Sequence, residues 1–203
     1  MPASERYNIA HLIDEQVVNQ TLDWLEARPE VVARLGRCSI NLSGHSMGNP
    51  EFIQFLLDRL ANSVIPCERL CLEITETAAM KNVALAMEFF AQLKALGCLI
   101  ALDDFGSGLS SFGYLRQLPL DIVKIDGMFV RDMHENETDL IMVRAINELA
   151  QQMKKQTVAE FVENPDIIDR LLELGVDYAQ GYVIGKPKPL GELIEELLAE
   201  LER

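Results

Sequence analysis

Six polar side chains stand near the ends of six short apolar runs, where they could together carry out metal chemistry. They are Asn41, Glu73, Asp103, Lys124, Glu160 and Gln180. Amide and charged groups are costly to bury without partners, so these groups need each other, metal ions or a ligand. The side-chain oxygens of four of them are expected to form a cluster that suits Mg²⁺ or Mn²⁺ rather than a soft metal. These four are Asn41, Glu73, Asp103 and Glu160. Asp104 directly follows Asp103, and a carboxylate that can bridge two ions indicates a two-metal phosphoesterase-type site.

A loop rich in glycine and serine follows the carboxylate pair. Residues 105–111 read Phe-Gly-Ser-Gly-Leu-Ser-Ser, a polar and conformationally permissive stretch. One interpretation is a plain glycine turn before a helix. The other is a loop that moves beside the metal ions and carries the state of the ligand or of a dimer into the site.

Each candidate residue also has an ordinary structural explanation. Asn41 could be a turn or cap residue, and the pair Asp103 and Asp104 could cap the helix that follows. Lys124 could form a structural ion pair with a neighbouring carboxylate. Such explanations hold for single residues, but the recurrence of polar residues at successive strand ends favours one shared site.

The elements that must position these residues alternate between strand and helix. Strand-like runs lie at 37–43, 69–75, 98–103, 121–126, 156–160 and 177–180. Apolar residues at helical spacing predict helices over 8–27, 50–60, 77–96, 137–153 and 165–174, with a last one over 190–201. Gly97 and Gly175 stand where two of these helices would be capped.

The strands are apolar on both faces and each is followed by a helix, which predicts a parallel sheet covered by helices. A doubly wound open sheet and a β/α barrel both fit this order. No Gly-x-Gly-x-x-Gly follows the first strand, which weakens the dinucleotide-binding form of the open sheet. The C-terminal strand ends of a barrel converge, and that would gather the six polar residues. We therefore predict an α/β fold of the TIM-like β/α barrel type.

Alternation along the strands predicts which residues share a face. Asp103, Lys124 and Glu160 should share one face with the residues two positions before them, because side chains on a strand alternate. Those residues are Ala101, Ile122 and Val158, and the intervening ones that should face the helices are Leu102, Val123 and Ala159.

Composition excludes several classes of partner. The 203 residues carry a formal net charge of −14, which disfavours DNA and anionic membrane surfaces. A small phosphate ligand remains possible if metal ions offset the carboxylates. No apolar run approaches the roughly 18 residues of a membrane span, and no signal peptide is recognisable. The cysteines, expected as free thiols of a reducing, cytoplasmic compartment, are Cys38, Cys67, Cys71 and Cys98.

The motifs, taken in order, closely resemble the EAL-domain family. The similarity runs over residues 2–189, nearly the whole chain. The matching stretches are Asn41-Leu42-Ser43, Glu73-Ile74-Thr75-Glu76, Asp103-Asp104-Phe105-Gly106-Ser107-Gly108 with Ser110-Ser111, Lys124-Ile125-Asp126, Ala159-Glu160 with Val162-Glu163, and Gln180-Gly181-Tyr182 with Pro187. Six ordered motifs make chance agreement improbable.

The resemblance implies a second-messenger phosphodiesterase that hydrolyses cyclic di-GMP to linear pGpG with Mg²⁺ or Mn²⁺, bound as two ions. It implies that the first ion is bound by Asn41, Glu73 and Asp103, and the second by Asp103, Asp104 and Glu160. Lys124 would orient the attacking water, and Glu76 would anchor the loop from Phe105 through Gly106 and Ser107 to Gly108. Gln180 would complete the wall near the metals, with Glu163 lining or supporting the site and Pro187 in the last motif.

Two departures from the family pattern stand out. The family begins with two further strands, the second of which carries a metal-binding Glu-Ala-Leu triplet that is absent from this chain. We therefore expect a single domain over residues 1–203 that is incomplete at its N-terminus, with about six of eight barrel strands. Phe161 also stands where the family usually has glycine, and it could either shift Glu160 or fill missing volume.

These departures leave two functional readings. One is the phosphodiesterase, and the other is a catalytically impaired EAL-type module that binds cyclic di-GMP or a protein partner. A third, weaker reading is another metal-dependent barrel phosphoesterase. The family also leads us to expect a homodimer, and sensory or diguanylate cyclase domains in the parent protein.

Overall fold

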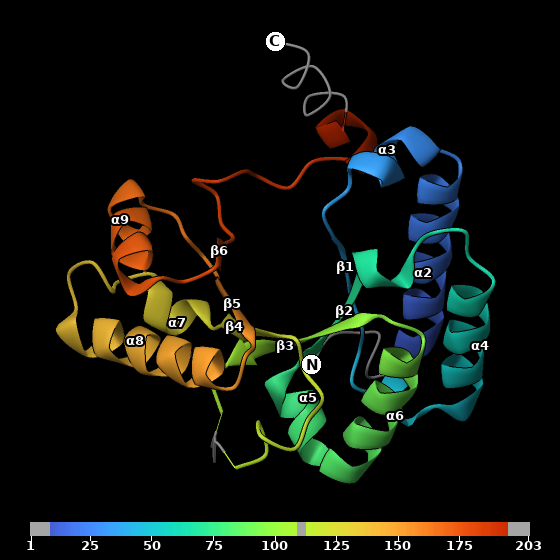
Figure 1. Cartoon of the computed structure of the whole chain (residues 1–203), viewed down its shortest axis with the longest axis horizontal. Coiled ribbons are helices and arrows are strands. Elements are labelled where there is room, and N and C mark those ends of the chain that lie inside the picture. The colour runs from blue at the N-terminus through green and yellow to red at the C-terminus, as the bar shows by residue number, and fades with distance from the viewer. Residues whose placement is uncertain (1–8, 109–112, 195–203) are drawn as a thin grey trace.

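The computed structural model describes residues 9–108 and 113–194, and its centre is a six-stranded parallel sheet (Figure 1). The strands are β1 (Cys38–Asn41), β2 (Leu70–Thr75), β3 (Leu99–Phe105), β4 (Ile122–Ile125), β5 (Gln156–Ala159) and β6 (Tyr178–Ala179). They pair in sequence order, β1-β2-β3-β4-β5-β6, and every pair is parallel. This is the strand order of a β/α barrel, here as a partial barrel in which β1 and β6 are the edges. All six predicted strands are confirmed, most of them with shorter ends.

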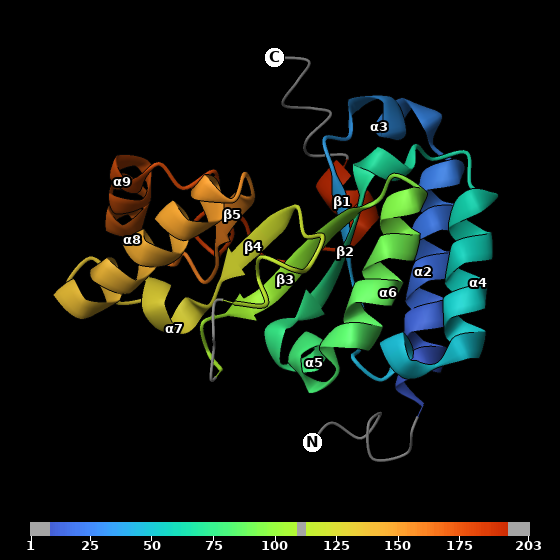
Figure 2. The same cartoon turned by 60° about the horizontal axis from the view of Figure 1, so that its bottom comes forward.

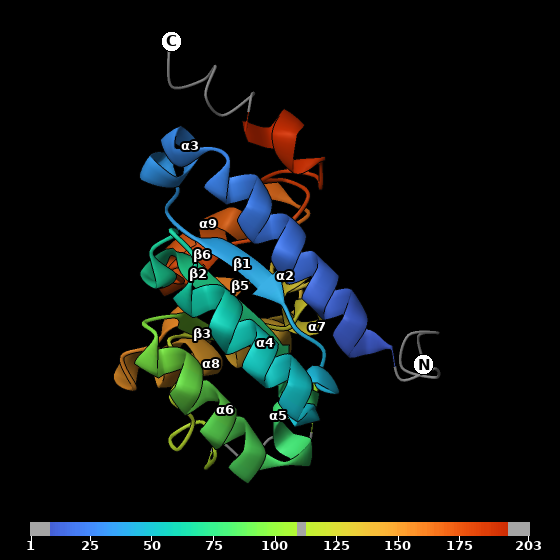
Figure 3. The same cartoon turned by 90° about the vertical axis from the view of Figure 1, so that its right-hand side faces the viewer.

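The helices described lie on the outer face of the sheet, two of them before β1 and the others between successive strands. They are α2 (Ala10–Glu26), α3 (Pro29–Arg34), α4 (Pro50–Ala61), α5 (Glu76–Lys81), α6 (Val83–Ala95), α7 (Gly127–Val130), α8 (Glu137–Gln152) and α9 (Pro165–Leu174), with single 3₁₀ turns η1 (Ser46–Gly48) and η2 (Cys67–Arg69). Figures 2 and 3 show α2, α4 and α6 running side by side, with α8 and α9 at the other end of the sheet. None of the helices described is both long and apolar enough to cross a bilayer.

One helix prediction was wrong. The stretch expected as a single helix over 77–96 is two helices, α5 and α6, and the break falls at Asn82. The side chain of Asn82 accepts a hydrogen bond from the Leu85 N–H at 3.1 Å, so it starts a new helix instead of continuing the old one. The short helices α3 and α7 were not predicted, because each spans too few residues to show a periodic pattern. In the last predicted helix, residues 190–194 are helical and the remainder lies outside the described residues.

Polar caps fix where the outer helices begin and end. Asn49, Asn136 and Asn164 each accept a hydrogen bond from a backbone N–H in the first turn of the helix that follows. Gly175 ends α9 with φ of 69°, a left-handed conformation that suits glycine, as predicted for a helix cap. The starts of these three helices are therefore set locally by the asparagine that precedes each of them.

The two faces of the sheet bury different sets of residues, as the strand alternation predicted. Leu102, Val123 and Ala159 belong to the large core between sheet and helices. A separate small cluster on the other face consists of Cys71, Ala101, Ile122 and Val158. Each member of this small cluster stands two positions before a candidate site residue. The site therefore continues the inner face of the sheet toward its C-terminal edge.

Candidate active site

A buried lysine at the end of β4 contacts three carboxylates from three other strands. The Nζ atom of Lys124 lies 2.9 Å from Oε2 of Glu73, 2.8 Å from Oδ1 of Asp103 and 2.8 Å from Oε1 of Glu160. The lysine is only 3% exposed, and Glu73 and Glu160 are nearly as buried. The sequence prediction that these strand ends converge at one rim is therefore confirmed by the positions of these four residues.

A β-bulge places two consecutive carboxylates at the same site. The pairing of β3 with β4 shifts register between Leu102 and Phe105, so Asp103 and Asp104 together stand opposite the single residue Lys124. Asp104 has φ of 53°, a left-handed conformation that is uncommon for a residue with a side chain. Simple strand alternation would turn the two carboxylates to opposite faces. The bulge removes that restriction, and no feature of the sequence pattern revealed it.

Three of the carboxylates are close enough to share a metal ion. Oxygens of Asp103, Asp104 and Glu160 all lie within 4.8 Å of one another. The Oε2 atom of Glu160 is buried and has no hydrogen-bond partner among the described residues. An unpartnered buried carboxylate oxygen beside other hard oxygen donors fits a divalent cation such as Mg²⁺ or Mn²⁺. The residues present therefore fit the ion that the sequence predicted here.

Burial and mutual charge shift the pKa values of this cluster. Burial raises the pKa of Glu160, and the negative charges of Asp103 and Asp104 raise it further. These effects outweigh the hydrogen bond and positive charge of Lys124, which lower it, so the pKa is about 7. Burial would lower the pKa of Lys124, but Glu73, Asp103 and Glu160 raise it above its ordinary value. The pKa of Asp104 is raised by burial and then by Asp103 and Asp126. The lysine is thus a fixed positive charge, while Glu160 can bind or release a proton near neutral pH.

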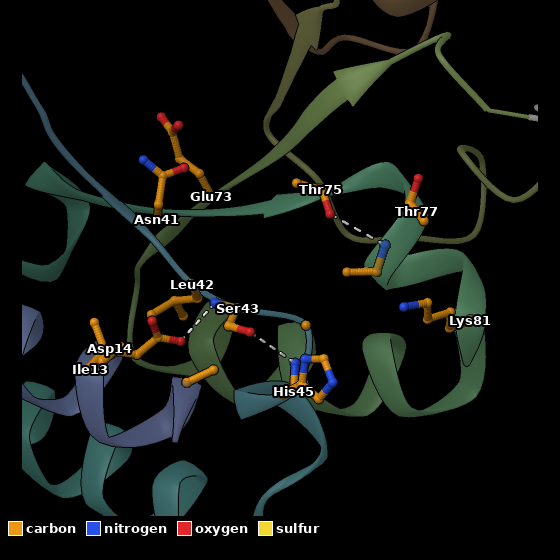
Figure 4. Close-up of a pocket in the computed structure, with 13 residues that line it drawn as sticks. Ile13, Asp14, Asn41, Leu42, Ser43, His45, Glu73, Thr75, Thr77 and Lys81 are labelled. Atoms are coloured by element: carbon orange, nitrogen blue, oxygen red, sulfur yellow. Dashed lines mark hydrogen bonds between the residues drawn. The ribbon is translucent and has the colours of Figure 1, made fainter. Parts of the chain in front are cut away.

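Asn41 extends the site along the first strand. It pairs in register with Glu73, and Figure 4 shows the two side chains directed the same way. Both line a groove of about 500 Å³ at the rim, which also reaches His45 and Lys81 (Figure 4). Unlike Glu73, Asp103 and Glu160, Asn41 is exposed and does not contact Lys124 in any described interaction. The groove gives a ligand access to the carboxylate cluster from the side of β1.

A residue that sequence reasoning missed holds the segment after β1. Oδ2 of Asp14, on α2, accepts hydrogen bonds from the Ser43 N–H at 2.7 Å and from the Ser46 hydroxyl at 2.6 Å (Figure 4 shows the first). Burial raises the pKa of this carboxyl group. Asp14 lies among the apolar residues of a helix with no strand-end signal near it, so only the fold reveals its role beside Asn41.

The loop after β3 is attached to the site through Glu76. The Gly106 N–H donates to Oε2 of Glu76 at 2.9 Å, and the hydroxyl of Tyr114 donates to Oε1 of the same carboxylate. Glu76 is buried at the start of α5, and Gly108 also lies against its carboxylate. Glu76 thus contacts the start of this loop and also Tyr114, a residue that was not predicted.

The remaining predicted residues lie at or beyond the margin of the site. Phe105 is fully buried in the core behind β3, and the Ser107 hydroxyl donates to the Asp104 carbonyl oxygen at 2.9 Å. Gln180 is exposed but lines a cavity of about 170 Å³ together with Glu73 and Lys124. Glu163 and Pro187 are exposed and are not part of the carboxylate cluster. Ser110 and Ser111 of the loop motif lie outside the described residues.

The fold and this rim define a β/α-barrel protein with a buried, oxygen-rich site at the C-terminal ends of its strands. The family comparison then identifies the family. The sequence profile of the EAL domain matches residues 1–187, and the chain belongs to the EAL domain family.

Relatives with curated names include several cyclic di-GMP phosphodiesterases. The chain is 44% identical over 200 residues to cyclic di-GMP phosphodiesterase PdeB of Shewanella oneidensis, covering 98% of this chain and 23% of that protein. It is 37% identical over 188 residues to cyclic di-GMP phosphodiesterase PdeA of Borreliella burgdorferi, covering 92% of this chain and 28% of that protein. The chain thus spans about a quarter of the length of these relatives.

Solved structures confirm the TIM-like fold class. The EAL enzyme Bd1971, in its form bound to cAMP and cyclic di-GMP, superposes with a TM-score of 0.84 at 30% identity over 92% of this chain and 52% of that one. The EAL domain of Xanthomonas citri FimX, in complex with cyclic di-GMP, superposes with a TM-score of 0.83 at 28% identity over 92% of this chain and 74% of that one. The MucR phosphodiesterase in its cyclic di-GMP complex superposes with a TM-score of 0.80 at 28% identity over 95% of this chain and 78% of that one.

Proposed function

We propose that this chain is a metal-dependent phosphodiesterase domain that hydrolyses cyclic di-GMP to linear pGpG in bacterial second-messenger signalling. The observation that carries the proposal is the buried carboxylate cluster around Lys124, with an unpartnered oxygen on Glu160. Relatives named cyclic di-GMP phosphodiesterases support the choice of substrate. A structural role alone does not explain why a buried carboxylate oxygen is left without a partner.

The cluster supports a site for two Mg²⁺ or Mn²⁺ ions. Asn41, Glu73 and Asp103 would hold the first, and Asp103 would bridge to the second with Asp104 and Glu160. Bound divalent ions supply Lewis acidity and neutralise charge on the phosphodiester oxygens. The adjacent carboxylates on the bulge make Asp103 the member best placed to serve both ions, because its neighbour in sequence faces the same site.

The protein's own residues then position the reactants. Lys124, held between three carboxylates, keeps a protonated ammonium group at the centre of the site and orients the attacking water. Glu160 and Asp104 are the carboxylates that would take the proton that the water loses, because their oxygens lie within 4.8 Å of each other at the same rim. The groove that reaches Lys81 offers space and a positive group for the nucleotide beside the cluster.

A binding-only module is the second candidate. Lys124 already balances part of the carboxylate charge without an ion. That balance favours a domain that binds cyclic di-GMP but turns it over slowly or not at all. The two candidates share the fold and the ligand. They differ in whether the carboxylate cluster binds metal ions in a form that supports hydrolysis.

A turnover assay beside a binding titration separates the candidates. Cyclic di-GMP is incubated with the chain and Mn²⁺, and pGpG is followed by chromatography, while binding is measured in Ca²⁺ by calorimetry. Turnover that is abolished by Glu160→Gln with binding retained supports the enzyme. Binding without turnover under Mg²⁺ or Mn²⁺ supports the binding module. Absence of binding under all these conditions contradicts both candidates and favours another barrel phosphoesterase.

The proposal extends to the setting of the domain. We place it in the cytoplasm, because its free cysteines and its cyclic nucleotide substrate both belong to a reducing interior. We also propose a homodimer, and a parent protein that joins this domain to sensory or diguanylate cyclase domains. The length of the curated relatives supports the last point, since they are about four times as long as the matched region.

A further inference from the structure

Phe161 occupies a backbone conformation that a residue with a side chain adopts only at a cost. Its φ is 53°, and it lies directly after the buried Glu160 at the end of β5. The backbone is held on both sides, because the Glu160 N–H donates to the Ile125 carbonyl at 3.2 Å and the Val162 N–H donates to the Gln180 carbonyl at 3.0 Å. Phe161 therefore holds a left-handed backbone conformation between two hydrogen-bonded neighbours. Contacts of its ring must offset the cost of that conformation.

The ring of Phe161 lies in a seat formed by the first turn of α7. A methyl group added at Gly127 would lie 2.6 Å from Cγ of Phe161 and closer still to Cδ2, so the ring occupies the space of the missing side chain. The guanidinium carbon of Arg131 lies 4.2 Å from the ring centroid on a face of the ring. Phe161 is still 43% exposed, so this seat covers only part of its surface.

The seat itself is rigid. Oδ1 of Asp126 accepts a hydrogen bond from the Met128 N–H at 2.8 Å and so caps α7 directly after the strand that carries Lys124. On its other side, α7 packs against the loop after β3, where a methyl group added at Gly106 would lie 2.7 Å from the ring of Phe129. α7 is thus fixed between the loop beside the carboxylate pair and the end of β5.

We propose that Phe161, seated on Gly127 and covered by Arg131, is a positioning residue that fixes the direction of the Glu160 carboxylate. This inference rests on the proposed function, in which Glu160 binds a divalent ion. Glu160 and Phe161 share a peptide bond, so a displacement of residue 161 moves the backbone from which the Glu160 side chain extends. The ring holds residue 161 against α7, which also follows the strand of Lys124, the partner of Glu160 at 2.8 Å.

The test is a double-substitution cycle on the full chain, read out as Mn²⁺ affinity by calorimetry. Gly127→Ala expels the ring from its seat, whereas in the Phe161→Gly background the same methyl group meets no ring. We expect Gly127→Ala alone to weaken Mn²⁺ binding about tenfold, as loss of support around a metal ligand does. In the double variant, affinity should equal that of Phe161→Gly alone, and Phe161→Tyr should bind Mn²⁺ as the wild type does.

Gly36→Ala is the matched control, because a methyl group there meets nothing within 4 Å. Wild-type affinity in Gly127→Ala, or simple addition of the two effects in the double variant, overturns the proposal. If Gly127→Ala does not fold, Arg131→Ala takes its place, with loss of affinity expected and with Arg131→Lys retaining it. Equal affinities in these two Arg131 variants and the wild type overturn the proposal.

A second readout separates this inference from the proposed function. If the wild-type chain binds no Mn²⁺, the proposed function fails, but the crystal structure of Gly127→Ala still decides the role of Phe161. We expect Oε1 of Glu160 to move out of hydrogen-bonding range of the Lys124 ammonium, which it contacts at 2.8 Å in the wild type. An unchanged separation between these two atoms, with the ring displaced, shows that Phe161 does not position Glu160.

Discussion

The ammonium group of Lys124 lies 2.9 Å from Oε2 of Glu73, although 51 residues separate them in sequence. The contact spans the sheet from β4 to β2 across the end of β3, which contributes Asp103 to the same lysine. One cation therefore connects the ends of several strands at the rim. The carboxylates that would hold metal ions are kept together by this lysine before any ion binds.

Lys124→Met should destabilise the metal-free protein strongly. Removing the cation leaves the buried carboxylates of Glu73 and Glu160 and the half-buried carboxylate of Asp103 without a counter-charge, and breaking a buried pair in this way costs about 3–5 kcal/mol. Urea unfolding without metal should show that loss in the free energy of unfolding. Arg170→Met is the matched control, since Arg170 forms an exposed pair with Glu173 at 2.9 Å and should change stability by less than about 1 kcal/mol. Equal effects of the two substitutions would show that the cluster is solvated.

The stability of the metal-free protein should fall as pH rises toward neutrality, in part because of Glu160. Its pKa is about 7 in the folded chain and 4.5 ordinarily, so the folded state holds the proton more tightly than the unfolded state. The resulting stability is fully present below about pH 4.5 and is lost as pH rises through about 7, a change of up to about 3 kcal/mol.

Glu160→Gln isolates this contribution, because glutamine does not titrate. Urea unfolding of both proteins at pH 5 and pH 8 should show a larger fall for the wild type than for the variant. Comparing the change in the free energy of unfolding with pH between the two proteins removes the contribution of other carboxylates whose pKa values are raised, such as Asp104. With Mn²⁺ present the wild-type slope should reverse, because metal binding requires the ionised carboxylate. Parallel slopes for the two proteins without metal would contradict the pKa assignment.

Glu76→Ala should loosen the loop after β3. The substitution removes the acceptor of the Gly106 N–H and of the Tyr114 hydroxyl, and unpartnered buried groups of this kind cost about 1–3 kcal/mol. Hydrogen exchange at the Gly106 amide should accelerate, and turnover of cyclic di-GMP should fall at least about tenfold, which corresponds to about 1.4 kcal/mol of transition-state stabilisation. Tyr114→Phe leaves the Gly106 bond intact and should have the smaller effect on both readouts. Unchanged exchange in Glu76→Ala would show that other contacts hold the loop.

The sequence alone predicts the sheet and most of the site because both follow simple periodicities. Apolar runs with one polar residue near the end mark all six strands, and two-residue alternation correctly assigns Ala101 and Ile122 to the face that continues into the site. The break at Asn82 was missed because helical spacing of apolar residues continues across it, and only the cap hydrogen bond reveals the new helix start.

What the sequence did not predict depends on contacts between distant residues. The bulge that turns Asp103 and Asp104 to the same site is a property of the pairing of β3 with β4, so no pattern within one strand signals it. The seat of Phe161 likewise depends on the absence of a side chain at Gly127, a residue that no sequence feature singled out. The places of the site residues at the strand ends were predictable from the strand order. The directions of the side chains of Asp104 and Phe161 required the packed structure.

Asp14→Ala should release the segment that follows Asn41. Asp14 is the acceptor for the Ser43 N–H at 2.7 Å and for the hydroxyl of Ser46, which is fully buried. Without it, both donors lose their partner, and the free energy of unfolding should fall by about 1–3 kcal/mol. The affinity for Mn²⁺ should also fall, because Asn41, two residues before Ser43, would no longer be held in one position beside Glu73.

A double-substitution cycle with Ser46→Ala tests whether the hydrogen bond itself causes this loss. Removing both partners leaves no unpartnered hydroxyl, so the double variant should be less destabilised than the sum of the single variants, by about 0.5 kcal/mol or more. Asp14→Asn keeps an oxygen acceptor of the same shape and should recover most of the stability and of the Mn²⁺ affinity. If Asp14→Ala lowers stability while the Mn²⁺ affinity stays at the wild-type value, Asp14 supports only the fold. The position of Asn41 would then be set by its pairing with Glu73 in the sheet.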